Sequence, residues 1–286
     1  MMVKILCDSA CDLSLETLQN YNVDCLPLSV TIGGEEFEDG KTIIPEKVYS
    51  LMRDGESPKT SQVSPQAFRD TFINYVKEEQ EFIYFAFSSE LSGTYQTAKM
   101  VEQEVKEEYP DAKFEIIDTE AASLGYGLII LRIAELAKEG KTFEEIVEIG
   151  SFHAEHMEHI FTVDDLEYLY RGGRVSKTAA FVGSLLRIKP LLHMEDGKLI
   201  PLEKIRGSKK VLRRMVDVMK ERGVDLNKQR LAISHGDDIQ TAEKLAEMIR
   251  EEFGTKEIHI EMVGAVIGAH AGPGTIALFF LNKSPE

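Results

Sequence analysis

The chain has 286 residues, of which 43% are hydrophobic and 29% are charged. This composition is typical of a folded globular protein and excludes a disordered tail or linker, and the length suggests two domains. The 33 basic and 49 acidic residues give a net charge of −16. Nucleic acid is therefore disfavoured as a general partner, because a negative field repels phosphate backbones.

Neither a secretory signal nor a membrane span is predicted. The N-terminal segment meets Asp8 before it can supply the roughly 7 to 15 apolar residues of a signal core. The longest apolar run, residues 276–281, is far shorter than the roughly 20 residues that cross a bilayer. Cys7, Cys11 and Cys25 lack the spacing of a zinc site, so we interpret them as reduced thiols. We expect a cytoplasmic protein.

Short apolar runs alternate with longer helical patterns over the first 160 residues. Strands are predicted at residues 3–6, 25–32, 82–87 and 114–117, and helices at 45–52, 64–76, 94–108 and 124–137. This alternation is typical of strand–helix–strand units built around a parallel sheet. It predicts an α/β domain in the first half of the chain.

The pattern changes near residue 160. Residues 185–194 and 198–205 are predicted to form a hairpin across Asp196-Gly197, which is a strong two-residue turn signal. Helices at 208–221 and 241–253 and strands at 231–234, 258–262 and 275–280 are predicted to follow. We expect a second α/β layer with a mixed or antiparallel sheet, and no proline-rich or glycine-rich linker marks the boundary.

Two motifs resemble ligand-binding patterns, but neither is predicted to bind a ligand. The segment from Gly33 to Lys41 has the wrong spacing for a phosphate loop and contains three carboxylates, so we predict an exposed β-turn there. His153, His156 and His159 are spaced for one helix face, but an apolar run begins directly after the third. We therefore expect that third histidine to lie beyond the helix end, and we do not predict a metal site.

Residues 88–94 follow a buried strand and precede a helix. Open α/β sheets bind ligands at the carboxyl ends of their strands, and a helix N-terminus offers free N–H groups. This loop, Ser-Ser-Glu-Leu-Ser-Gly-Thr, is therefore a candidate anion site. Serine and threonine also favour helix caps, so on this loop alone a capped helix start is an equally good interpretation.

Three further segments favour ligand binding. Residues 58–62 form a hydroxyl-rich loop, residues 264–274 form a glycine-rich apolar loop around His270, and Arg171 and Arg174 flank two glycines. Each has an ordinary explanation as a cap, a core histidine or a helix end stopped by glycine. Together they supply hydroxyls, a histidine and arginines without an evident nucleophile–carboxylate pair. This inventory suits holding a carboxylate better than cleaving a bond.

Six stretches of the chain form a recognisable set: Asp8-Ser9, Thr60-Ser61-Gln62, residues 88–95, residues 165–174, Ile188-Lys189-Pro190 with Asp196-Gly197, and residues 268–274. In this order they closely resemble the DegV family over essentially the whole chain. DegV proteins are bacterial fatty-acid-binding proteins, and in many species they are the lipid-carrying subunits of fatty-acid kinase. The thiols of Cys7 and Cys11 beside Asp8-Ser9 are a departure without an evident role.

The resemblance implies a Rossmann-like parallel-sheet domain at residues 1–160, an α/β domain with a mixed sheet at residues 161–286, and a fatty acid between them. It implies no cofactor and no ATP site, with a separate kinase subunit phosphorylating the bound carboxylate to an acyl phosphate. Arg174 and Arg206 would lie at an exposed rim where that kinase docks. The fatty-acid carboxylate would be bound by or near Thr60, Ser61, Ser92, Gly93, Arg171 and His270.

Residues 171–214 contain twelve basic and three acidic residues, a local charge of +9 in an acidic chain. Such a surface could steer the protein toward an acidic kinase surface or toward an anionic membrane. A chance cluster of solvated side chains is the alternative interpretation.

A stand-alone serine acyl hydrolase is the alternative function. It would use Ser88 or Ser92 as the nucleophile, His235 or His270 as the base, and an acid such as Asp118 to orient that base. It requires a histidine within hydrogen-bonding reach of the serine. A third interpretation, an interaction module that uses only the basic surface, would leave the apolar loops without a role.

Overall fold

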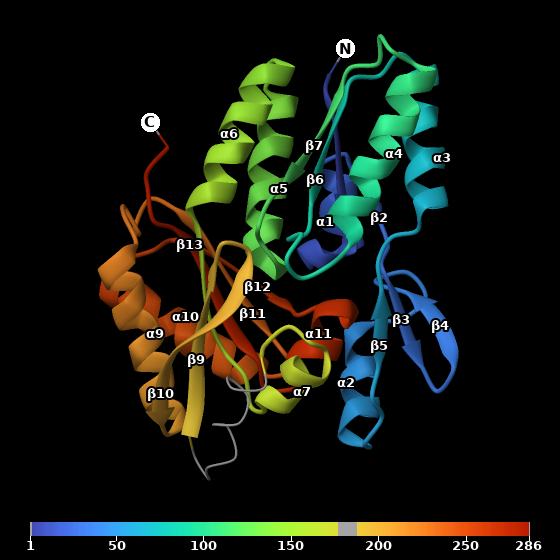
Figure 1. Cartoon of the computed structure of the whole chain (residues 1–286). Helices are drawn as coiled ribbons and strands as arrows, with labels where there is room; N and C mark the ends of the chain where they lie inside the picture. The colour runs from blue at the N-terminus through green and yellow to red at the C-terminus, as the bar shows by residue number, and fades with distance from the viewer. Residues whose placement is uncertain (1, 177–187, 286) are drawn as a thin grey trace.

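The structure is a computed structural model that describes residues 2–176 and 188–285. Figure 1 shows an upper part in which a sheet lies between pairs of helices, and a lower part built on a larger sheet. The predicted α/β class is confirmed, since the chain forms a parallel four-stranded sheet and a mixed six-stranded sheet. Among the described residues, no helix is both long and apolar enough to cross a membrane.

The four-stranded sheet has the order β2-β1-β6-β7, and all its strands are parallel. β6 is buried along its whole length, as expected for a strand that helices cover on both faces. Helices α3 and α4 lie on one face and α5 and α6 on the other (Figure 1). The elements of this part are β1 (Lys4–Asp8), η1 (Ser9–Cys11), α1 (Leu15–Asn20), β2 (Val23–Leu26), α3 (Pro65–Lys77), β6 (Phe82–Ala86), α4 (Thr94–Glu108), β7 (Phe114–Asp118), α5 (Ser123–Lys138) and α6 (Phe143–His156).

A third, small antiparallel sheet was not predicted. The strand expected at residues 25–32 ends at Leu26 and resumes at Ser29, because Pro27 between them has no N–H group for a sheet ladder. The second piece pairs with residues 59–61, so Thr60 and Ser61 lie on a strand and not on the predicted loop. The elements are β3 (Ser29–Ile32), β4 (Glu35–Glu38), α2 (Pro45–Arg53) and β5 (Lys59–Ser61), with the order β4-β3-β5.

The six-stranded sheet has the order β10-β9-β8-β13-β11-β12. Only β11 and β12 are parallel, which confirms the mixed sheet predicted for the second half. Residues 185–187 of the predicted hairpin lie outside the described part. The elements are β8 (Met157–Thr162), α7 (Leu166–Arg171), β9 (Ile188–Glu195), β10 (Lys198–Arg206), α9 (Ser208–Arg222), β11 (Arg230–His235), α10 (Ile239–Phe253), β12 (Glu257–Met262), α11 (Ala265–Ala271) and β13 (Ile276–Leu281).

Two predicted turns are confirmed. Gly33 and Gly34 join β3 to β4 with φ angles of 62° and 88°, so the segment that resembles a phosphate loop forms a hairpin. Asp196 and Gly197 join β9 to β10 with φ angles of 48° and 73°. Both residues of a two-residue hairpin turn of this kind need positive φ, which explains the glycines and the aspartate.

Helix α11 corrects another prediction, because residues 264–274 were expected to form a loop. Seven of them form a helix, Ala265–Ala271, which begins after Gly264 and ends before Gly272. The Asp39 carboxylate accepts a hydrogen bond of 3.1 Å from the Ala265 N–H in the first turn of this helix. Small residues let the helix pack closely: a Cβ at Gly268 would lie 2.5 Å from the Tyr49 hydroxyl oxygen. This contact ties α11, which carries His270, to α2 of the N-terminal half.

The six-stranded sheet has an apolar core on each face. Along β13, Ala277 and Phe279 face the core that is shared with α5 and the four-stranded sheet, while Leu278 and Phe280 face the core under α9 and α10. This alternation follows from the two-residue period of a strand. The first core is continuous between the two sheets, so a space between them is bounded by side chains from both halves.

Candidate functional site

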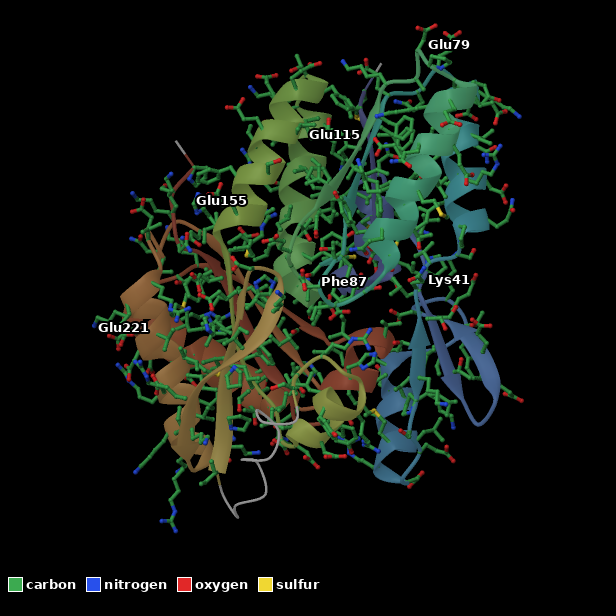
Figure 2. All side chains as sticks on the ribbon, in the orientation of Figure 1. Lys41, Glu79, Phe87, Glu115, Glu155 and Glu221 are labelled. Atoms are coloured by element: carbon green, nitrogen blue, oxygen red, sulfur yellow. The ribbon has the colours of Figure 1, made fainter. Side chains whose placement is uncertain are left out.

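A cavity of about 390 Å³ lies where the three sheets and α11 meet. Its volume falls within the range of roughly 300 to 1,000 Å³ that is common for small-molecule sites. Phe87, labelled in Figure 2 at the end of β6, is part of its wall. Most of the wall is apolar and comes from both halves of the chain: Leu28, Phe87, Leu91, Ala122, Phe161, Leu169, Met194, Leu199, Val263, Val266, Ile267, Ala271, Ala277 and Phe279.

Hydroxyl and imidazole groups gather at the part of the cavity next to β5. Thr60 and Ser61 on β5 line it together with His270 on α11. Thr60 Oγ1 lies 2.7 Å from His270 Nε2, so this hydrogen bond joins the two halves of the chain. Burial, and then the nearby Arg174 guanidinium, lower the pKa of His270 from 6.5 to about 4. The imidazole is therefore neutral at pH 7.

The loop at residues 88–94 contributes Ser92 and Gly93 to the same cavity. Ser92 Oγ accepts a hydrogen bond of 3.3 Å from the Thr94 N–H at the start of α4, whereas the N-cap position is Gly93, which has no side chain to cap the helix. The expected serine or threonine cap is therefore not found at the N-cap of α4, and Ser92 lines the cavity. Gly93 has a steric role, because a Cβ there would lie 2.2 Å from Gln62 Oε1.

Arg171 and Arg174 do not take the positions that the sequence suggested. Arg174, expected at an exposed rim, is half-buried, lines the cavity and donates hydrogen bonds of 3.0 and 2.8 Å to the Leu91 carbonyl. Arg171, expected beside the carboxylate, is exposed and does not line the cavity. The reason is local: α7 ends at Arg171, and Gly173 with φ of 74° reverses the chain and returns Arg174 to the cavity.

Arg171 lies instead in a second depression of about 360 Å³, which we call the outer depression. Thr60, Arg174 and His270 belong to both concavities and form the boundary between them. Gly172 packs against this boundary, and a Cβ there would lie 2.1 Å from His270 Nδ1. The outer depression is lined by Ser57, Pro58, Lys59, Thr60, Tyr168, Arg171, Gly172, Arg174, Ala269 and His270.

Comparison with known proteins gives the family. The model of the DegV family, described as uncharacterised proteins, matches residues 2–283. The chain belongs to the DegV family. A DegV domain-containing protein of Clostridium perfringens is 42% identical over 285 residues, which cover 99% of this chain and 98% of the relative.

Solved structures of DegV proteins share the fold. A fatty-acid-binding DegV protein of Thermus thermophilus has a TM-score of 0.89 at 30% identity, covering 98% of this chain and 99% of that one. A DegV protein of Eubacterium eligens loaded with heptadecanoic acid has a TM-score of 0.86 at 26% identity, covering 98% of this chain and 100% of that one. This DegV protein therefore has the fold of proteins that bind fatty acids.

The serine–histidine hydrogen bond that a serine hydrolase requires is not present among the described residues of this DegV protein. Ser88 Oγ donates to the Gly197 carbonyl at 2.8 Å, and Ser92 Oγ lies 2.8 Å from Thr94 Oγ1. Asp118 accepts from the Ser89 and Glu120 N–H groups and not from an imidazole. Within residues 2–176 and 188–285, no hydrogen bond joins either candidate serine to a histidine.

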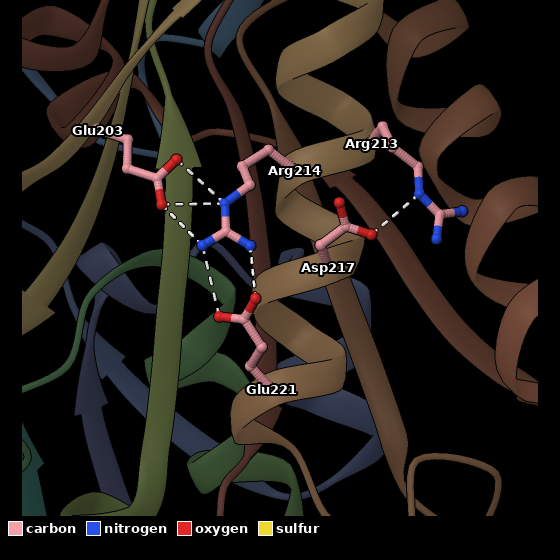
Figure 3. A network of polar contacts seen from close by, with 5 residues as sticks. All are labelled: Glu203, Arg213, Arg214, Asp217 and Glu221. Atoms are coloured by element: carbon pink, nitrogen blue, oxygen red, sulfur yellow. Dashed lines mark hydrogen bonds and ion pairs between the residues drawn. The ribbon is translucent and has the colours of Figure 1, made fainter.

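Salt bridges offset much of the basic segment of the DegV chain. Arg214 pairs with Glu203 at 2.7 Å and Glu221 at 2.6 Å, and Arg213 pairs with Asp217 at 2.9 Å (Figure 3). The expected +9 surface is therefore smaller than the composition suggests, and Lys177 and Arg187 lie outside the described residues. Within the described part of the segment, exposed cations without a salt bridge are Lys204, Arg206, Lys209 and Lys210.

The three spaced histidines of the DegV chain are separated by the end of α6, as expected. His153 and His156 lie on α6, and His159 lies on β8. Among the residues that the structure describes, no group of three or more His, Cys, Asp or Glu side chains is arranged to hold a metal ion.

A second polar group in the cavity was missed. Ser123 at the start of α5 and Ser234 on β11 line the cavity, and their hydroxyl oxygens lie 3.0 Å apart. Ser123 also donates a hydrogen bond to the Asp12 carboxylate, and burial raises the pKa of Asp12 well above its usual value. The group joins both halves of the DegV fold. One signal was available: Ser234 lies near the carboxyl end of a strand and Ser123 follows one, which is where α/β sheets place polar site residues.

His159 should make the stability of the DegV fold pH-dependent. Its Nε2 accepts from the Ala122 N–H at 3.1 Å, and burial lowers its pKa from 6.5 to about 4. Between these values the unfolded chain binds more protons, so stability is lost as pH falls from about 6.5 to about 4. The stability difference between the wild type and His159→Gln should shrink by on the order of 3 kcal/mol over this interval.

Urea denaturation at several pH values tests this prediction, with His156→Gln as the matched control. Other titrating groups contribute equally to both proteins and cancel in the difference. A difference between wild type and His159→Gln that stays constant from pH 7 to pH 4 would contradict a neutral, buried His159.

Proposed function

We propose that this protein binds a long-chain fatty acid in the cavity between residues 1–160 and 161–286, with the carboxylate beside β5. The observation that supports the proposal is an apolar cavity with hydroxyl groups and a neutral histidine on one side. These polar groups lie beside the boundary between the cavity and the outer depression, which contains basic side chains. A fatty acid has the matching form, an apolar chain with one anionic end. Fatty-acid binding by the Thermus thermophilus protein and the heptadecanoic acid of the Eubacterium eligens protein support the same ligand class.

The acyl chain supplies most of the affinity. Burying a methylene group gains roughly 0.8 kcal/mol, so a chain of about sixteen carbons provides a large binding energy without any polar contact. The head group then fixes the orientation. A buried carboxylate without partners is very costly, and charge-assisted hydrogen bonds offset this cost.

Thr60, Ser61, Ser92 and Gly93 are the proposed donors to the carboxylate, with His270 positioning the Thr60 hydroxyl. The Nε2 atom of neutral His270 can accept a hydrogen bond from the Thr60 hydroxyl. In the other tautomer, Nε2 donates a hydrogen bond to Thr60 Oγ1 while the threonine hydroxyl donates to the ligand. The role of Arg171 must differ from direct contact inside the cavity, because its side chain lies in the outer depression.

We further propose that the protein presents this carboxylate to a separate ATP-binding kinase subunit and takes no cofactor of its own. The carboxylate oxygen attacks the γ-phosphorus of ATP, the bond from phosphorus to the ADP oxygen breaks, and ADP leaves with the electron pair. The product is an acyl phosphate. Arg206, exposed at the end of β10, and Arg174, which reaches the boundary of the outer depression, are the proposed docking residues. Transient contact with an anionic membrane would use the same charges.

A kinase assay tests the presentation step. The palmitate-loaded protein is mixed with the ATP-binding fatty-acid kinase subunit of the same organism, and acyl phosphate is trapped with hydroxylamine. We expect hydroxamate only when both proteins and ATP are present, and we expect Arg206→Glu to reduce its rate at least tenfold, while Arg250→Glu on α10 does not. Hydroxamate formed by this chain and ATP alone would contradict the proposal.

A further inference from the structure

The three cysteines of the chain meet at one place in the fold. Cys7 on β1 and Cys25 on β2 are paired positions of neighbouring parallel strands, so their side chains lie on the same face of the sheet. Cys11 lies in η1, directly after β1, and its Sγ atom is 3.9 Å from the Sγ atom of Cys7. All three thiols are free.

The spacing of these cysteines permits a disulfide. Neighbouring strands lie roughly 4.8 Å apart, and the Cα atoms of a disulfide lie roughly 4.4 to 6.8 Å apart. The paired positions of Cys7 and Cys25 therefore meet the backbone requirement. The Cys11 thiol lies against the Cys7 thiol, so the cluster offers two buried partners to Cys25.

Of the three thiols, that of Cys25 is the one open to a reagent. Cys7 and Cys11 are fully buried, whereas Cys25 is partly exposed and lines a depression of about 380 Å³, which we call the cysteine depression. Hydrogen bonding from the Cys11 thiol, and then from the Cys7 thiol, lowers the pKa of the Cys25 thiol below its usual value. Because the thiolate is the reactive form of cysteine, we expect Cys25 to react first.

The charge of the cysteine depression favours a neutral reagent. Of the described residues that line it, four are acidic, and Lys41 is the one basic residue. A negative field disfavours an anionic oxidant such as glutathione disulfide, but it does not repel a small neutral one such as hydrogen peroxide. The acidic residues are Asp12, Asp39, Glu46 and Glu261.

We propose that hydrogen peroxide oxidises Cys25, and that Cys7 or Cys11 then closes a reversible disulfide with it. The Cys25 thiolate attacks one peroxide oxygen, the O–O bond breaks, and hydroxide leaves a sulfenic acid on Cys25. The partner thiol attacks the Cys25 sulfur, the S–O bond breaks, and the departing hydroxide takes the thiol proton and becomes water. Two thiols are oxidised by two electrons, and one peroxide is reduced to two waters. The site lies outside the fatty-acid cavity, so this inference does not depend on the proposed function.

Thiol counting in the purified full-length protein tests this assignment. The reduced protein is treated at pH 7 with a few equivalents of hydrogen peroxide, denatured in acid and alkylated, and mass spectrometry counts the alkylated thiols. The wild type should fall from three alkylated thiols to one, and dithiothreitol should restore all three. Cys25→Ala should lose thiols at least tenfold more slowly, although its two remaining thiols lie 3.9 Å apart.

The double variant Cys7→Ser/Cys11→Ser tests which thiol reacts first. It has no partner for a disulfide, so the sulfenic acid of Cys25 should accumulate and be trapped by dimedone. Thermal unfolding checks that each variant is folded, and Cys25→Ala alone decides the point if the double variant is not.

Peptide mapping of the oxidised wild type completes the test, and it should join Cys25 to Cys7 or to Cys11. Three thiols that survive the peroxide, a disulfide between Cys7 and Cys11, or equal rates in the wild type and Cys25→Ala would overturn the assignment. A mixed disulfide that forms with glutathione disulfide as fast as peroxide reacts would overturn the choice of oxidant.

Discussion

The double variant Thr60→Val/Ser92→Ala is expected to bind palmitate at least 100-fold more weakly than the wild type. Both hydroxyls line the cavity, and Thr60 is held by His270 at 2.7 Å. A hydrogen bond to a charged group contributes roughly 1.5 to 3 kcal/mol, so loss of two such bonds to a buried carboxylate weakens binding by about 3 to 6 kcal/mol. Calorimetry or displacement of a fluorescent fatty acid measures the change.

Ser89→Ala is the matched control for this variant. Ser89 lies in the same loop as Ser92 but does not line the cavity, so its removal should leave affinity unchanged. Thermal unfolding checks that all variants remain folded. Unchanged palmitate affinity in a folded double variant would refute the placement of the head group.

Filling the cavity with a larger side chain at Ala277 should shorten the longest acid that binds well. Ala277 lies on β13 and faces the cavity, where a phenyl ring would occupy space that we assign to the acyl chain. For the wild type, each added methylene should strengthen binding about fourfold until the cavity is full. In Ala277→Phe the gain should stop several methylenes earlier, which makes palmitate about 100-fold weaker than in the wild type.

Short acids provide the internal control for this series. Acids that do not reach the ring should bind the wild type and Ala277→Phe within threefold of each other, because their head-group contacts are the same. A series from eight to eighteen carbons measured with both proteins decides the point. Parallel rises through palmitate in the two proteins would place the acyl chain elsewhere.

Local patterns were sufficient to predict much of the fold. The buried run at residues 82–87 and the Asp196-Gly197 turn are signals that a few neighbouring residues determine, and the structure has a strand and a hairpin there. Helix α11 was missed because glycines at residues 264, 268, 272 and 274 lower helix propensity. Its stability comes from distant partners, including Asp39 and Tyr49, which no local pattern reveals.

The candidate site shows the same limit. Thr60 and Ser92 were proposed from hydroxyls near strand and helix ends, which is a local signal, and both line the cavity. Both Arg171 and Arg174 line the outer depression, and only Arg174 also lines the cavity. This difference depends on how Gly172 and Gly173 turn the chain after α7, which the sequence pattern does not reveal. The Asp12–Ser123 contact joins residues 111 positions apart, so it arises only when the two parts of the fold meet.

Mass spectrometry of the lipid bound to the purified protein tests the central claim most directly. The protein is extracted with organic solvent, and the fatty acid is quantified against the protein before and after incubation with excess palmitate or oleate. We predict close to one long-chain fatty acid per chain after loading, and a much lower yield from Thr60→Val/Ser92→Ala. A folded wild-type protein that yields no fatty acid and takes up neither palmitate nor oleate would contradict the account.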